Sequence, residues 1–242
     1  ICDREEQINE FEPSEYWTIM AKLLKNRRHL EAKYAGRLVG ERLESEPMAT
    51  KEDADAVLKR MDKEKFTVHD IQKGTRKRRT LAPFTTSTMQ QEANKRLNFS
   101  TRKTMQVAQR LYEGITIPGE GSVGLITYMR TDSTRISDQA VARTKSYVLS
   151  TYGKEYSQPS TWSKKKDNTQ DAHECIRPAD VMRTPYDLKD SLGKDEYKLY
   201  QLIWSRFVAS QMTAAEYATQ KVKLLSNEEL FQLNGNTLVF DG

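Results

Sequence analysis

The sequence GLITYMRTDSTRIS, residues 124–137, places a short apolar run directly before a tyrosine, an arginine and several small polar residues. The apolar start predicts a strand, and residues i and i+2 of a strand lie on the same face. Tyr128 and Arg130 are therefore expected to stand side by side at the end of a rigid element. A strand that only fills a core does not need this pair, so the stretch predicts a functional site.

The chemistry of this pair suits phosphoryl transfer. A phenol has a pKa near 10 and is a poor nucleophile at neutral pH, but a fixed cation beside it favours the phenolate. A guanidinium can also hold a phosphate through two hydrogen bonds. Tyrosine and arginine at one phosphate thus predict a phosphotyrosine intermediate. An isolated tyrosine would more simply belong to a core. The polar residues that follow can hydrogen-bond the backbone or a sugar-phosphate and are candidate contacts: Thr131, Asp132 and Ser133.

A second motif, AHECIRPAD at residues 172–180, contains groups that can serve the same phosphate. His173 can donate a hydrogen bond to a phosphate oxygen or carry a proton. Arg177 adds positive charge, and Pro178 fixes the backbone after it. Taken alone, the motif fits a turn with a surface histidine equally well.

Strands are predicted toward both ends of the chain. Residues 30–34 and 217–225 alternate apolar and polar side chains, and Asn234-Gly235 within FQLNGNTLVF (231–240) predicts a hairpin. One helix is expected between Ser14 and Leu24, from a capping serine and the spacing of Trp17, Met20, Leu23 and Leu24. Thr50 and Asp53 resemble a capping box for another helix.

The middle of the chain is predicted to be helical. Ser100 and Gly114 bracket one helix, Ser137 begins another, and a third runs near 194–212. The fold class is therefore α+β. A strand-rich domain is expected from residues 1–83 together with 213–242, and a mainly α-helical inserted domain from residues 84–212, which carries Tyr128.

The charge of the chain favours an acidic partner. Its 242 residues contain 39 Lys and Arg against 34 Asp and Glu, a net charge of +5. The basic residues cluster, and such clusters are typical of surfaces that face phosphates, although solvated loop charge is the simpler explanation for any one cluster. The candidate nucleic-acid contacts are Arg76, Lys77, Arg78, Arg79, Arg102 and Lys103.

Several other classes of site are disfavoured. The two cysteines, Cys2 and Cys175, form no disulfide framework, which favours a reducing, cytoplasmic setting. The sequence has no secretory signal and no apolar run long enough to span a membrane. Histidines and cysteines lack zinc spacing. Asp53 and Asp55 fall in the first turn of a predicted helix, where acids favour the dipole, so no metal site is expected in this chain.

The two motifs together are far more specific than either alone. They resemble the tyrosine and histidine motifs of the type IA family of bacterial DNA topoisomerases, and residues 83–114, the opening CDREEQINEFEPSEYW and the closing LVFDG also resemble that family. The resemblance covers nearly the whole chain. It implies that Tyr128 attacks a DNA phosphodiester and is left joined to the 5′ phosphate. Arg130 would position that phosphate, and His173 matches the histidine of the family's HEAIRP motif. Cys175 replaces the usual alanine there; it is small and apolar, so the chemistry is expected to be unchanged, while the thiol adds a group that can be oxidised.

The resemblance also implies what the chain lacks. It resembles the arch or hinge domain and the tyrosine-bearing helical domain, whereas nothing in it matches the toprim domain, which supplies Mg²⁺ ligands, or the DNA-gripping segment. The start at Ile1 and the end at Gly242 suggest part of a longer protein. The complete enzyme is expected to bind single-stranded DNA and Mg²⁺ and to relax negative supercoils in the cytoplasm, at the bacterial nucleoid. The chain alone is expected to be inactive.

Two alternatives explain part of these observations. A tyrosine recombinase would carry its histidine and arginine before the tyrosine, with HxxR spacing, whereas here Tyr128 comes first and His173 to Arg177 reads HxxxR. A non-catalytic module that binds single-stranded nucleic acid would explain the basic clusters. It would leave the pair of Tyr128 and Arg130 unused.

Overall fold

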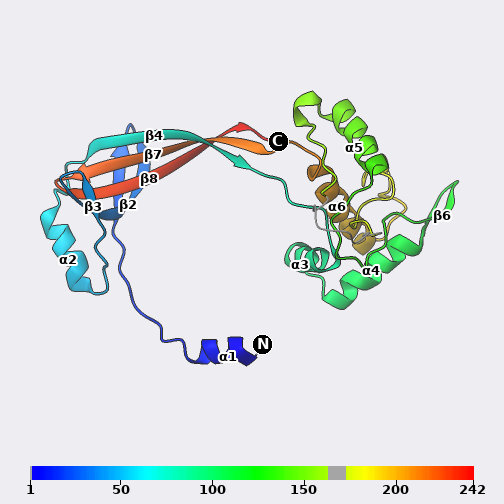
Figure 1. Ribbon diagram of the computed structural model, residues 1–242, viewed down its shortest axis with the longest axis horizontal. Coiled ribbons are helices and arrows are strands. Elements are labelled where there is room, and N and C mark those ends of the chain that lie inside the picture. The colour runs from blue at the N-terminus through cyan, green and yellow to red at the C-terminus, as the bar shows by residue number, and fades with distance from the viewer. Residues whose placement is uncertain (1, 163–172) are drawn as a thin grey trace, which may run out of the picture. The chain divides into compact units, whose positions relative to one another are not determined.

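The structure is a computed structural model that describes residues 2–162 and 173–242. The chain divides into two compact units. The sheet unit comprises Ile1–Arg76 and Tyr217–Val239, and the helical unit comprises Lys77–Glu216 and Phe240–Gly242. The domain boundaries predicted from the sequence, 83/84 and 212/213, each lie a few residues from the boundaries between these two units. The mixture of helices with an antiparallel sheet agrees with the predicted α+β class (Figure 1).

The sheet unit is built on a six-stranded sheet in the described part of the chain. The strands are β1 (Met20–Lys25), β2 (Arg28–Val39), β8 (Glu229–Phe240), β7 (Ala215–Ser226) and β4 (Thr67–Arg78), hydrogen-bonded in that order, with β3 (Arg42–Glu44) paired to β2. β1, β3 and β8 all run antiparallel to β2. The helices α1 (Cys2–Asn9) and α2 (Lys51–Arg60) complete the unit.

The core of the sheet unit lies between the sheet and α2. The Phe231 ring is fully buried and meets the rings of Tyr34 and Phe66 edge-on, at centroid distances of 5.5 and 5.3 Å. Val57 of α2 packs into the same cluster. The predicted capping box of α2 is confirmed, because Thr50 Oγ1 accepts from Asp53 N–H and the Asp53 carboxylate accepts from Thr50 N–H. These bonds hold the pKa of Asp53 below its usual value.

A buried carboxylate ties α2 to the sheet. Glu229 accepts a hydrogen bond from the Tyr34 hydroxyl and another from Arg60 Nε, each at 2.6 Å. Only 1% of the Glu229 side chain is exposed, so the charge depends on these partners for its solvation. Burial, and then the bond to Glu229, raise the pKa of Tyr34. Arg60 thereby fixes the end of α2 to the first residue of β8.

The helix predicted between Ser14 and Leu24 is wrong. Residues 20–25 form β1, and β1 joins β2 through Asn26 and Arg27, which both adopt positive φ, 50° and 63°. Two consecutive left-handed residues suit a tight hairpin turn. Along β1, Ala21 and Leu23 pack against the core cluster of the sheet unit. The spacing of the apolar residues is compatible with both a helix and a strand. The hydrogen bonds between β1 and β2 select the strand.

The hairpin predicted at Asn234-Gly235 is also wrong. β8 runs without interruption from Glu229 to Phe240, and neither residue has positive φ. A two-residue turn of this kind requires positive φ at both positions. The turn lies earlier, between β7 and β8, where Asn227 has φ of 54°. Twelve residues of β7 form the long neighbouring strand, which explains why β8 continues through its glycine.

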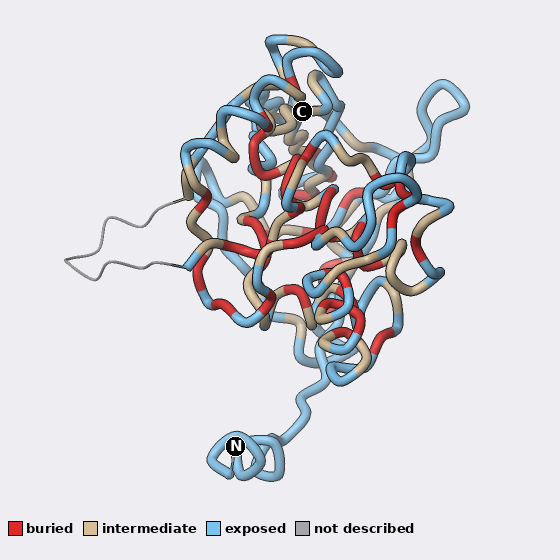
Figure 2. The backbone as a smooth tube through the Cα atoms, turned by 90° about the vertical axis from the view of Figure 1, so that its right-hand side faces the viewer, coloured by how far each residue is buried: buried red, intermediate tan, exposed pale blue. Residues whose placement is uncertain are grey.

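The helical unit contains the larger core. Its elements are α3 (Thr86–Leu97), α4 (Thr101–Glu113), β5 (Ile115–Ile117), β6 (Gly121–Val123), α5 (Asp138–Thr151), the 3₁₀ helix η1 (Lys154–Tyr156) and α6 (Lys194–Ala209). The face of α6 that carries Leu199, Ile203 and Phe207 is buried and packs against α3 and α4. Figure 2 shows the buried stretches and the exposed N-terminal segment, in which no residue of α1 is buried.

The predicted ends of the helices are partly confirmed. Ser100 caps α4 through a hydrogen bond from Lys103 N–H, and Gly114 ends it with φ of 134°. Ser137 occupies the cap position of α5 without a side-chain cap bond. Of the helices described here, none has the length and apolar character that crossing a bilayer requires.

Candidate active site

Three segments that are distant in sequence are joined around the tyrosine. Thr127 N–H donates to Arg177 O and Ala179 N–H to Leu125 O, both at 2.9 Å. Ile176 N–H donates to Phe84 O at 2.8 Å. Residues 84–86, 125–136 and 175–179 therefore form one hydrogen-bonded body, which we call the three-segment scaffold. It brings the tyrosine motif and the histidine motif together within the helical unit.

The strand predicted for residues 124–130 does not form. Ile126 makes one isolated bridge with Pro178, and no ladder continues from it, because Leu125 N–H donates to Leu111 O and Arg177 N–H donates to the Thr127 hydroxyl. The alternation of side chains is present all the same: Tyr128 and Arg130 are exposed, whereas Met129 between them is fully buried. The backbone bends at Met129 and is anchored by individual hydrogen bonds instead of a sheet.

The tyrosine segment enters the scaffold at Gly124. A Cβ atom at this position would lie 2.7 Å from the carbonyl oxygen of Tyr112, so only glycine fits without a shift of backbone. The next residue, Leu125, donates its N–H to Leu111 O at 2.7 Å. This close approach fixes the segment against the end of α4. There the Tyr128 ring meets the Tyr112 ring edge-on, at a centroid distance of 5.4 Å.

Tyr128 borders a cavity together with the predicted residues of the second motif. The side chain is 43% exposed, and the cavity has a volume of about 310 Å³. His173 and Arg177 line the same cavity, as does Thr131. The structure therefore places the phenol, the imidazole and a guanidinium around one space large enough for a phosphate group.

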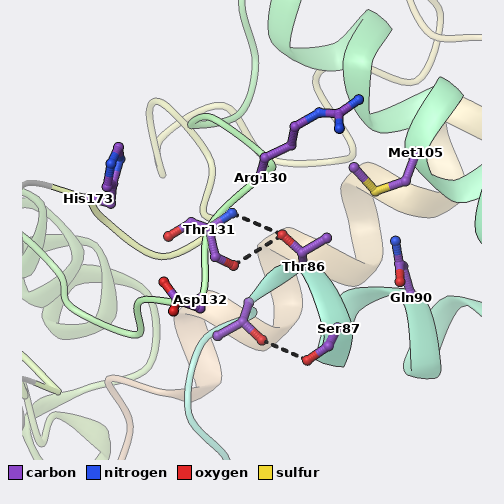
Figure 3. Close-up of a pocket in the computed structure, with 9 residues that line it drawn as sticks. Thr86, Ser87, Gln90, Met105, Arg130, Thr131, Asp132 and His173 are labelled. Carbon is purple, nitrogen blue, oxygen red and sulfur yellow. Dashed lines mark hydrogen bonds between the residues drawn. The ribbon is translucent and has the colours of Figure 1, made fainter.

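Arg130 borders a different cavity, of about 620 Å³, with Asp132 and the start of α3. Figure 3 shows Arg130 and His173 extending to opposite sides of Thr131. His173 and Thr131 line both cavities. The sequence predicts that the Tyr128 phenol and the Arg130 guanidinium reach a single place. In the structure the two residues border different cavities, which share Thr131 and His173 in their lining.

Arg177 is held by an acid inside the site. Its Nε and terminal nitrogen both lie 2.7 Å from the Glu174 carboxylate, and another nitrogen donates to Pro178 O at 3.0 Å. Only 14% of its side chain is exposed. In this arrangement the guanidinium is a fixed positive charge in the cavity wall. Its predicted contact with DNA would require it to exchange Glu174 for a phosphate.

Thr86 is a positioning residue that the sequence did not reveal. Its hydroxyl lies 2.7 Å from the carbonyl oxygen of Met129, to which it donates. The same hydroxyl accepts from Thr131 N–H at 2.9 Å, as Figure 3 shows. These two groups belong to the peptides on either side of Arg130. Thr86 N–H also donates to Thr131 O at 2.9 Å. The PFTTST sequence indicates only a helix start, and nothing in it predicts a partner so distant along the chain.

We expect Thr86→Val to destabilise the chain by about 1–3 kcal/mol. Valine keeps the shape of threonine but removes the hydroxyl, which leaves the buried Met129 carbonyl and Thr131 N–H without this partner. Urea unfolding of the 242-residue chain measures the change. Thr86→Ser, which keeps the hydroxyl, is the matched control and should be destabilised less. A valine variant as stable as the native chain would contradict the role assigned to Thr86.

The remaining predicted contacts lie away from these cavities. Lys103 pairs with Asp195 at 2.8 Å and lies 4.3 Å from the centroid of the Phe99 ring, and Arg102 is exposed beside it in the first turn of α4. Arg76 belongs to the sheet unit, and residues 77–79 to the helical unit, all of them exposed. Ser133 is buried and its hydroxyl accepts from Arg135 N–H, so it supports the loop.

Cys175 is shielded from oxidation in this structure. The side chain is fully buried in the core of the helical unit. Burial raises the pKa of its thiol to about 12, and the opposing effect of the nearby Arg177 charge is smaller. Oxidation proceeds through the thiolate at an accessible sulfur, and both conditions are absent here. Cysteine thus serves as a small apolar residue in the place of alanine.

The described ranges, 2–162 and 173–242, contain no group of three or more His, Cys, Asp or Glu side chains that could hold a metal ion. Asp53 is engaged in capping α2. These residues therefore do not fit the Mg²⁺ that the family resemblance implies, and we assign it no role within them.

Comparison with known proteins agrees with these features. The family model for DNA topoisomerases matches residues 1–242. A crystal structure of full-length topoisomerase I from Thermotoga maritima, in a monoclinic form, superposes with a TM-score of 0.79 at 33% sequence identity. The match covers 100% of this chain and 37% of that protein, so the chain spans little more than a third of its relative. The chain therefore belongs to the bacterial type IA family of DNA topoisomerases.

Proposed function

We propose that this chain supplies the nucleophile of a type IA topoisomerase, which cleaves one DNA strand through a 5′-phosphotyrosine intermediate. The observation that carries the proposal is the position of Tyr128. The phenol is partly exposed on a cavity shared with His173 and Arg177, and its backbone is anchored by the three-segment scaffold. A rigidly held nucleophile suits attack on a phosphodiester, and Arg177 would add positive charge once a phosphate replaces its partner Glu174.

In the proposed reaction the Tyr128 oxygen attacks phosphorus and releases its proton to a base or to water. The new O–P bond forms as the bond between phosphorus and the 3′ oxygen breaks, and the departing oxygen takes up a proton. Religation reverses both changes. No bond is hydrolysed overall, so passage of a second strand through the break requires no ATP and relaxes negative supercoils. His173 lines both cavities and would contact the phosphate oxygens or carry a proton.

The rest of the catalytic set is proposed to lie in the portion of the enzyme that this chain does not match. The chain spans 37% of the T. maritima topoisomerase. The acid that protonates the 3′ oxygen and the carboxylates that hold Mg²⁺ would belong to a toprim domain. The substrate would be single-stranded DNA at the bacterial nucleoid.

We expect the 242-residue chain alone neither to relax supercoiled DNA nor to cleave a single strand, with or without Mg²⁺. Tyr128 and Arg130 offer a nucleophile and a cation, but the cavities are open to water, where stabilisation of charge is weak. Denaturing gels of the chain incubated with end-labelled oligonucleotide and with supercoiled plasmid test this. The complete enzyme on the same gels is the control. A Mg²⁺-dependent nick, or label carried on the protein, would contradict the expectation.

A second function, a non-catalytic module for single-stranded nucleic acid, is favoured by β4. This strand lies at the edge of the sheet and carries basic side chains at Lys73, Arg76, Lys77 and Arg78, all exposed. Binding through them would need neither Tyr128 nor Arg130. The two functions differ in one product, because only the topoisomerase leaves DNA attached to the protein.

We expect Arg76, Lys77, Arg78 and Arg79 to act on phosphates and not on bases. Replacing all four with glutamine should weaken binding of single-stranded DNA equally across sequences. It should also flatten the salt dependence by about 0.7 in slope for each phosphate that is no longer neutralised. Titrations at several salt concentrations measure both, and replacement by lysine at the three arginines is the charge-conserving control. A sequence-dependent decrease with unchanged salt slope would count against the assignment.

A further inference from the structure

A polar groove crosses the sheet unit where β4, β7 and β8 lie side by side. It has a volume of about 610 Å³ and draws its lining from all three strands. Its cations are Lys73 and Arg76 on β4 and Lys221 on β7, and no carboxylate lines it. Lys221 and the residues of β8 belong to none of the basic clusters that the sequence indicated, so strand pairing alone assembles this surface.

The charge of the groove is not cancelled from within the described part of the chain. Lys73 and Arg76 are exposed and Lys221 is half-buried. The nearby acid, Asp70, is already engaged, because it accepts from Gln72 Nε2 at 2.9 Å and faces Lys223 Nζ at 3.6 Å. The groove thus presents net positive potential to an incoming anion.

A glycine on β4 keeps part of the groove floor open. Gly74 shares a face of its strand with Gln72 and Arg76, because every second residue of a strand lies on the same face. A Cβ atom at Gly74 would lie 3.2 Å from Thr219 Oγ1 of the neighbouring strand β7. Glycine within a strand often marks a place where another group approaches the backbone closely.

The polar lining favours recognition of phosphates and not of bases. Asn234 Oδ1 accepts from Gln232 Nε2 at 3.1 Å, so it is the amino group of Asn234 that can serve an anion. Gln220 and Asn236 add further amide donors. Amide and cationic donors are the usual partners of DNA phosphates. Base stacking, by contrast, requires aromatic side chains, and no aromatic residue lines this groove.

We propose that the β4–β7–β8 groove binds the phosphodiester backbone of DNA without regard to base sequence. The groove shares no residue with the cavities at Tyr128 and Arg130. The proposal rests on DNA as the partner and does not depend on the phosphotyrosine chemistry, because binding is measured without cleavage.

The test is a DNA titration of the 242-residue chain carrying Lys73→Gln, Arg76→Gln and Lys221→Gln. Without these three charges the salt slope should fall by about 2–3, which at 0.1 M salt corresponds to a decrease in affinity of about 100- to 1,000-fold. The decrease should be the same for oligonucleotides of two base compositions. The matched control removes three exposed charges of the same unit on β1 and β2, Lys22, Lys25 and Lys33, and should retain the native slope.

A second variant distinguishes the effect of the groove's shape from the effect of its total charge. Gly74→Val keeps every charge but adds a side chain to the floor beside Thr219, and valine suits a strand. It should weaken binding severalfold in a chain that remains folded. The proposal is overturned if the triple variant binds like its control, if the decrease depends on base composition, or if a folded Gly74→Val chain binds like the native one. Failure of this test would leave Tyr128 cleavage untouched.

Discussion

Tyr128→Phe in the complete enzyme, in which this sequence is joined to the rest of a type IA topoisomerase, should abolish relaxation and adduct formation while DNA binding persists. Phenylalanine removes only the attacking oxygen. The edge-on contact of the ring with Tyr112 and the hydrogen bonds of the scaffold involve other atoms and should remain. Activity should vanish completely, since no other group can form the same bond to phosphorus.

The neighbouring tyrosine provides a matched control for this experiment. Tyr112 is 40% exposed, close to the 43% of Tyr128, and the two ring centroids are 5.4 Å apart. Tyr112→Phe should therefore retain the adduct. The adduct is trapped on labelled oligonucleotide, digested and mapped to a peptide. Label on the Tyr128→Phe variant, or label mapped to Tyr112, would show that Tyr128 is not the nucleophile.

Arg130→Lys should lower the cleavage rate by a factor of about 30–1,000, which corresponds to roughly 2–4 kcal/mol of transition-state stabilisation. Lysine keeps the charge but does not have the planar fork that can hold two phosphate oxygens. The backbone on both sides of Arg130 is fixed by Thr86, so the side chain projects from an anchored position. A change in the head group therefore acts on a preorganised contact.

Single-turnover cleavage of a labelled oligonucleotide measures this effect. Arg102→Lys is the control, because Arg102 is also exposed and lines neither of the two cavities described for the site. It should cleave at nearly the native rate. If the Arg130→Lys variant also cleaved at nearly the native rate, Arg130 would act only as diffuse positive charge. That outcome would be consistent with the position of Arg130 in a cavity other than the one that Tyr128 borders.

Features encoded by neighbouring residues could be predicted from the sequence. The capping box of Thr50 and Asp53 and the ends of α4 at Ser100 and Gly114 depend on contacts within one turn. The errors fell where distant strands decide the conformation. β1 needs β2 to become a strand, and β8 passes through Asn234-Gly235 because of the long neighbour β7. Local patterns do not contain that information.

The same distinction applies to the site. Two motifs indicated Tyr128, His173 and Arg177, and the structure gathers them at one cavity. The separation of Arg130 into a second cavity follows from the route of the backbone between Met129 and Thr131, which depends on Thr86. That interaction could not be predicted from the sequence, because a threonine at the start of a helix has an adequate local explanation.

The contrast between the two cysteines offers a built-in probe of motion. Cys2 is exposed, whereas Cys175 is buried within the scaffold that carries Tyr128. A thiol reagent should modify the first at once. It should reach the second only during transient opening of the surrounding core. The labelling rate of Cys175 in denaturant therefore measures the free energy of opening of the scaffold that carries Tyr128, with no engineered label.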